Sequence, residues 1–75
     1  MTTKIEQNFM IDCILTDLAI YLMRDYGYDE AEALQTVYNS EYYTRLVDTS
    51  TSFYTESSAY NYHFLRHELE YGKVA

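Results

Sequence analysis

Three side chains near the end of the sequence, His63, His67 and Glu70, have a spacing that could hold a metal ion. Residues three or four apart on a helix lie on one face, and imidazole and carboxylate groups are common zinc ligands. However, no fourth ligand lies in a nearby segment, and the flanking Arg66 and Glu68 are typical of a solvated helix face. The pattern therefore favours an exposed surface, with metal binding as the alternative.

Other reactive groups lack the neighbours that catalysis needs. Cys13, the one cysteine, follows Phe9 by one helical turn and is expected to pack as a small apolar side chain. Asp12 and Asp17 are five residues apart, about 140° around a helix, so they do not form a carboxylate pair. We therefore predict that the chain is not an enzyme.

The hydroxyl-rich pair Ser57 and Ser58 has none of the flanking glycines that surround a nucleophilic serine on a sharp turn. Serine is a preferred residue at the first position of a helix, where its hydroxyl accepts a backbone hydrogen bond. We interpret the pair as part of a helix start.

Tyrosine is the most over-represented residue: the 75-residue chain has 10 tyrosines, no proline and no tryptophan. Four of them, at helical spacing beside aliphatic residues, are expected in the core: Tyr21, Tyr38, Tyr54 and Tyr60. A domain of this size cannot bury the rest as well, and exposed tyrosine is enriched at protein interfaces. The tyrosines expected at the surface are Tyr26, Tyr28, Tyr42, Tyr43, Tyr62 and Tyr71.

The net charge restricts the classes of partner. Twelve acidic and 5 basic residues give a charge of −7, and the bases are scattered along the chain. Such a surface repels a phosphate backbone and an anionic membrane, so we expect no direct binding to nucleic acid or to a membrane. The densest acidic cluster contains Asp25, Asp29, Glu30 and Glu32. Its side chains suit helix capping. Alternatively, the cluster imitates a nucleic-acid backbone and serves as a docking site for a basic partner.

The remaining bulk features predict one cytoplasmic domain over residues 1–75. A single cysteine fits a reducing compartment. The first ten residues hold no apolar run typical of a signal peptide. The most apolar stretch, residues 9–23, contains Asp12 and Asp17 and is too short to span a bilayer.

Capping signals divide the chain into helices. Thr3 and Glu6 fit a capping box and Gly27 fits a left-handed helix end, so the apolar period of 3.6 predicts a helix over residues 4–26. Asp29 and Glu32 open a second helix that reaches about residue 39.

Ser40 opens a short third helix, residues 48–52 read as a loop, and a last helix runs from Ser52 or slightly later to Tyr71. The expected fold class is all-α, a compact bundle of about four helices, two long and two short.

One further pattern of caps, small residues and aromatics covers nearly the whole chain: Asp29, Glu32, Ala33, Leu34, Tyr38, Asn39, Ser40, Leu46, Asp48, Thr51, Tyr54, Ser57, Tyr60, Leu65, Glu68 and Leu69. In this pattern the chain resembles a family of short, acidic, all-helical bacterial proteins of unknown function, frequent in gut anaerobes. The resemblance implies a binding role, in some cases beside toxin-like or mobile-element genes, with no catalytic residue.

Together these features predict a non-enzymatic protein–protein interaction module without a cofactor. It would be the small acidic partner or regulator of another bacterial protein, antitoxin-like in character, or a homodimer. The predicted partner-binding residues are Tyr26, Tyr28, Asp29, Glu30, Glu32, Tyr42, Tyr43 and Tyr62. The alternatives are an acidic nucleic-acid mimic that inhibits a DNA-binding protein, and a small metal-binding helical protein.

Overall fold

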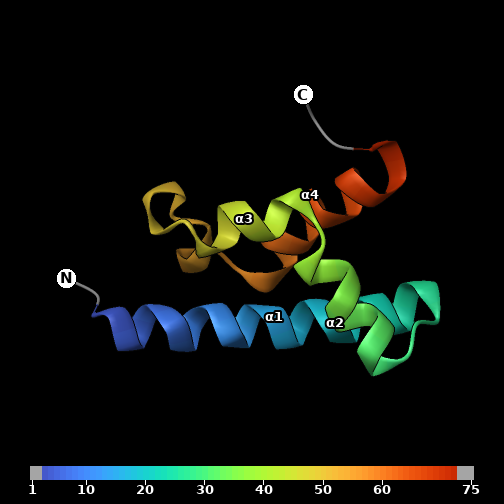
Figure 1. Ribbon diagram of the computed structural model, residues 1–75, viewed down its shortest axis with the longest axis horizontal. Helices are drawn as coiled ribbons and strands as arrows, with labels where there is room; N and C mark the ends of the chain where they lie inside the picture. The colour runs from blue at the N-terminus through green and yellow to red at the C-terminus, as the bar shows by residue number, and fades with distance from the viewer. Residues whose placement is uncertain (1–2, 73–75) are drawn as a thin grey trace.

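A computed structural model describes residues 3–72, and these residues form four α-helices and two 3₁₀ helices, without a strand. In Figure 1 the long first helix lies along one edge of the molecule, with the third and fourth helices on one side of it. The all-α bundle is therefore confirmed. The elements are α1 (Lys4–Tyr26), α2 (Glu30–Tyr38), α3 (Glu41–Val47), η1 (Thr49–Thr51), η2 (Phe53–Thr55) and α4 (Ser58–Tyr71).

Local caps fix the ends of the first helix. The Thr3 hydroxyl accepts the Glu6 N–H at 3.2 Å, which pairs one of the amides that a helix start leaves open. At the other end Gly27 adopts a left-handed φ of 70° and donates its N–H to the Met23 carbonyl at 3.1 Å. The predicted helix over residues 4–26 is confirmed.

The starts of α2 and α3 also follow the sequence signals. Asp29 accepts the Glu32 N–H at 2.7 Å, and Glu32 reaches back to the Asp29 N–H at 3.5 Å, which completes a capping box. Ser40 accepts the Tyr43 N–H at 3.1 Å and opens α3. Both predicted helix starts are confirmed.

The predicted start of the last helix is wrong. α4 begins at Ser58, six residues after Ser52, and its N-cap is Ser57, whose hydroxyl accepts the Tyr60 N–H at 3.1 Å. Ser52 has a left-handed φ of 62°, which interrupts any helix at that point. The Thr55 hydroxyl then binds the Ser52 carbonyl at 2.7 Å and stabilises the η2 turn in place of a helix.

The core lies where all four α-helices meet. The side chains with no solvent exposure include Leu18 and Leu22 on α1, Val37 on α2, Leu46 on α3 and Leu65 on α4. Around them are the other buried apolar residues: Ile11, Ile14, Leu15, Ala19, Ala33, Tyr42 and Tyr62.

The predicted burial of four tyrosines is wrong. Tyr38 and Tyr60, expected in the core, are 49% and 45% exposed, whereas Tyr42 and Tyr62, expected at the surface, are 3% and 8% exposed. In a short helix, neighbouring aromatic residues fit the 3.6-residue period about equally well. The apolar pattern alone therefore does not show which of the rings is buried. Cys13 likewise faces solvent, where burial was expected.

Asn61 is a fully buried polar side chain between α4, α3 and η2. Its amide oxygen accepts the Tyr42 hydroxyl, and its NH₂ group donates to the carbonyls of Phe53 at 3.0 Å and Ser57 at 2.9 Å. In the part of the chain that the structure describes, every buried side-chain nitrogen and oxygen has a hydrogen-bond partner. Burial without such partners would cost free energy, so this network fixes how η2 and α3 sit on α4.

Two further side-chain contacts connect α4 to distant helices. The Glu68 carboxylate accepts the N–H groups of Glu41 and Tyr42, both at 2.9 Å, and so caps α3 from another helix. The Ser58 hydroxyl donates to Asp17 at 2.6 Å and ties the first turn of α4 to α1.

Candidate protein-interaction surface

The turn between α1 and α2 brings two tyrosine rings together. Because Gly27 reverses the chain between them, Tyr26 and Tyr28 stack with ring centroids 5.5 Å apart and planes 21° from parallel. Tyr26 is 36% exposed, and Tyr28 is half-buried against the core. The pair thus offers an aromatic surface on a turn that the fold already holds in place.

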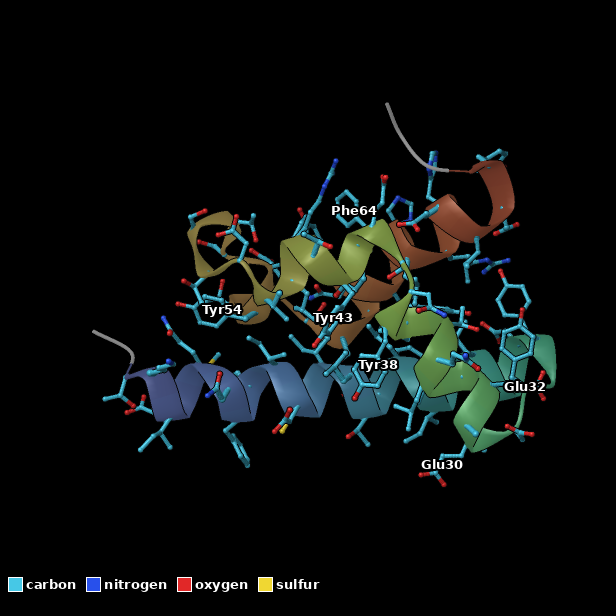
Figure 2. All side chains as sticks on the ribbon, in the orientation of Figure 1. Glu30, Glu32, Tyr38, Tyr43, Tyr54 and Phe64 are labelled. Atoms are coloured by element: carbon cyan, nitrogen blue, oxygen red, sulfur yellow. The ribbon has the colours of Figure 1, made fainter. Side chains whose placement is uncertain are left out.

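Three exposed carboxylates follow the rings at the start of α2. Asp29 and Glu32 form the capping box, and Glu30 stands beside them in the first turn. Figure 2 shows Glu30 and Glu32 at the same end of the molecule, with Glu30 directed away from the other helices. The predicted capping role is confirmed for Asp29 and Glu32. We call Tyr26, Tyr28, Asp29, Glu30 and Glu32 the acid–aromatic corner.

Asp25 supports this corner from the last turn of α1. Its carboxylate accepts from Arg24 Nε at 2.8 Å and Nη2 at 3.2 Å, and from the Tyr62 hydroxyl at 2.7 Å. The Arg24 and Tyr62 hydrogen bonds lower the pKa of Asp25 to about 2. The pKa of Tyr62 is raised, first by burial and then by the Asp25 carboxylate. Asp25 therefore joins the end of α1 to α4.

This contact should appear in the pH dependence of stability. The folded state lowers the pKa of Asp25 from 3.8 to about 2, so the stabilisation is complete above pH 3.8 and is lost as the pH falls through about 2. We expect urea unfolding of Asp25→Asn to show a shallower loss of stability from pH 4 to pH 2 than the natural chain. The loss of stability of Tyr62→Phe over this pH range should lie between those of the other two proteins, because the contact between Asp25 and Arg24 remains. If the free energy of unfolding fell equally with pH in all three proteins, the Asp25 carboxylate would not be the stabilising group.

Three other predicted partner-binding tyrosines are not part of the corner surface. Tyr42 and Tyr62 are buried, and burial raises the pKa of Tyr42. The prediction that these two rings lie at the surface is therefore wrong. Tyr43 is half-buried and meets Tyr38 edge-on, with centroids 5.2 Å apart and planes at 87°.

Tyr38 and Tyr43 line an open groove that the sequence did not indicate. Figure 2 shows the two rings near each other between α3 and α1. The groove has a volume of about 690 Å³ and its lining comes from three helices and η1, so no single-helix period could reveal it. The lining residues are Lys4, Gln7, Asn8, Ile11, Asp12, Leu15, Tyr38, Tyr43, Val47 and Thr49.

A second, smaller cleft lies between α3 and α4. Its volume is about 50 Å³, which is room for only a few water molecules. Tyr42, Arg45, Phe64 and His67 are among its lining residues. A cleft of this size does not hold a metabolite.

No protein-family model, curated protein or solved structure matches this chain. The function must therefore be inferred from the chemistry of the surface itself.

The weak metal candidates on α4 have other neighbours. The His67 ring lies 4.9 Å from the Tyr71 ring, and Glu70 pairs with Arg66 at 2.7 Å. The His63 ring contacts Phe64, with centroids 5.7 Å apart. Across residues 3–72, no group of three or more His, Cys, Asp or Glu side chains could hold a metal ion. Within the same range, no helix is both long enough and apolar enough to cross a bilayer.

Proposed function

We propose that this protein is a non-enzymatic interaction module that binds a basic surface of another protein through the acid–aromatic corner. The observation that supports it is the stacked Tyr26–Tyr28 pair beside three exposed carboxylates. Tyrosine provides large contact area at a small cost in conformational entropy, and acidic side chains around it select a partner of opposite charge.

The corner is already ordered before a partner arrives. The capping box fixes Asp29 and Glu32, and the Tyr28 ring packs against the core. A preorganised surface loses less conformational entropy on binding. The charge of −7 also attracts a basic partner over several ångströms, which raises the association rate at low salt.

The partner we propose is a cytoplasmic protein with a basic, functionally essential surface, which the corner occludes. The family resemblance implies a toxin-like protein, so the module would act as its small acidic regulator. Binding of this type weakens steeply with salt, because the attraction is between exposed charges.

The test begins with affinity capture from a host lysate over a salt series, followed by binding measurements on the purified partner. We expect one dominant protein that is lost by about 0.5 M salt, where the Debye length falls to a few ångströms. Tyr26→Ala combined with Glu30→Lys should weaken its binding at least about tenfold, as loss of an interface anchor does. Neither residue takes part in the capping box, so the variant should stay folded. Its melting temperature should fall modestly, because Tyr26 loses its packing on Tyr28 and the first turn of α2 loses an acidic side chain.

The matched control combines Tyr71→Ala with Glu56→Lys, which removes an exposed ring and changes the charge equally but away from the corner. Its affinity should equal that of the natural chain. Equal affinities for the corner variant and the control would refute the proposal. Competition by DNA for the same site would instead identify the nucleic-acid mimic.

A further inference from the structure

The outward face of α1 carries a second apolar stripe that the fold leaves uncovered. Ile5 is 82% exposed, Phe9 68%, Ile20 54% and Met23 40%, and Cys13 and Thr16 between them are also exposed. At 3.6 residues per turn all six side chains lie on the side opposite the core residues Leu18 and Leu22. We call Ile5, Phe9, Cys13, Thr16, Ile20 and Met23 the outer stripe.

The outer stripe is unusual for the surface of a protein with a charge of −7, because none of its six residues is charged. It runs from Ile5 to Met23, which are 18 positions apart, or about 27 Å at a rise of 1.5 Å per residue. Helices that are apolar on both faces are normally buried on both, and large uncharged surface patches mark interaction sites.

We propose that the outer stripe packs against the same stripe of a second copy, with the two α1 helices antiparallel. The spacing of the stripe residues supports a second copy as the partner, because it is nearly the same from either end of α1. An antiparallel partner centred between residues 14 and 15 brings Phe9 of each copy opposite Ile20 of the other. Cys13 then lies opposite Thr16, and Ile5 lies near Met23.

The charges beside the outer stripe also fit an antiparallel pair. Glu6 and Arg24 lie on the same flank of α1, 18 residues apart, which is five full turns. The antiparallel arrangement therefore brings Glu6 of each copy near Arg24 of the other. The Arg24 side chain remains 62% exposed beside Asp25 and can meet a second carboxylate. In a parallel pair this flank of one copy would instead face the opposite flank of the other, so Glu6 and Arg24 would not meet.

The size and chemistry of the face suit a small dimer. Two faces of this length and the width of one helix bury together about 1,000 Å², near the lower limit for a specific interface. The central residues Cys13 and Thr16 are small, so the helix axes can approach closely. The Thr16 hydroxyl already donates to the Asp12 carbonyl at 3.0 Å, so its burial leaves no donor unpaired.

The mass of the protein in solution tests the proposal. We expect light scattering after size exclusion, at micromolar concentration, to give twice the chain mass of 8.9 kDa. Phe9→Glu combined with Ile20→Glu should give a monomer with unchanged helical content, because both side chains are exposed. The control Ala31→Glu with Ala59→Glu adds the same charge at exposed positions off the stripe and should stay dimeric. A natural chain that is monomeric throughout would overturn the proposal and leave the stripe to a different partner.

Disulfide trapping tests the antiparallel orientation. In a Cys13→Ser background, a Phe9→Cys chain is mixed with a size-tagged Ile20→Cys chain under mild oxidation. We expect the mixed disulfide to dominate, since positions 9 and 20 of opposite copies face each other. Disulfides between identical chains only would show a parallel pair and overturn the arrangement. The corner variants leave the stripe unchanged, so failure of the proposed function would not affect this result.

Discussion

Asn61→Ala is expected to lower the free energy of unfolding by about 3 kcal/mol, the effect of lost hydrogen bonds and a buried hydroxyl left without an acceptor. The truncation removes the acceptor of the Tyr42 hydroxyl and the donor to the Phe53 and Ser57 carbonyls, all around a side chain with no exposure. A chain of 75 residues has a total stability of about 4–11 kcal/mol at typical values per residue, so this loss is a large fraction of the total. The melting temperature of the variant should fall by about 10–20 °C.

A double-mutant cycle separates the network from the loss of volume. Tyr42→Phe alone should cost about 1–2 kcal/mol, because it leaves the Asn61 oxygen buried without its donor. The same substitution in the Asn61→Ala background should cost much less, since the hydroxyl no longer has an acceptor. Equal costs in the two backgrounds, measured by urea unfolding, would show that the two side chains act independently.

Leu65→Ala is expected to cost about 3–5 kcal/mol, the range for a leucine truncation that leaves a cavity in a packed core. Leu65 is fully buried on α4, the helix that packs against α1 and α3. The matched control is Leu69→Ala, which makes the same chemical change one turn later in the same helix. Leu69 is 36% exposed, so its truncation should cost no more than about 1.5 kcal/mol. Thermal or urea unfolding that ranks the two variants equally would show that α4 is rotated from the orientation described.

The helix starts could be predicted where the cap lies within three residues of the amide that it binds. Thr3, Asp29 and Ser40 cap α1, α2 and α3 as the sequence indicated, and Gly27 ends α1. Such contacts form within one turn of chain, so residue type and spacing are sufficient to locate them. The last helix also has a local cap, because Ser57 binds the Tyr60 amide three residues later. The predicted start at Ser52 was wrong because Ser52 takes a left-handed conformation that its residue type does not require.

The orientation of the short helices depends on contacts between distant segments. The burial of Tyr42 follows from its bond to Asn61, 19 residues later in the sequence, and a polar Asn61 gives no sign of burial in a hydrophobic pattern. Glu68 likewise reads as an exposed acid, although it binds two amides of α3. These pairs become visible only when the helices have been placed.

For the candidate site too, the sequence could predict only the residues that lie close together along the chain. The corner residues lie within seven positions of sequence, so one turn and one capping box bring Tyr26, Tyr28 and the three acids together. Tyr43 instead lines a groove built from several elements. The outer stripe was missed because the longer run of large apolar residues on α1 defines the core face, and the small Cys13 and Thr16 interrupt the remaining apolar positions at their centre.

The cap that Glu68 provides also determines the order in which the molecule can fold. α3 has seven residues, too few for a helix to persist alone in water. Its first amides are bound by a carboxylate 26 and 27 residues away, so the intervening segment must close before α3 gains this support. α1 and α2 carry their caps locally and can pair early. We therefore expect the contacts between α1 and α2 to form before those of α3 and α4, and φ-values measured in the two pairs of helices would test this order.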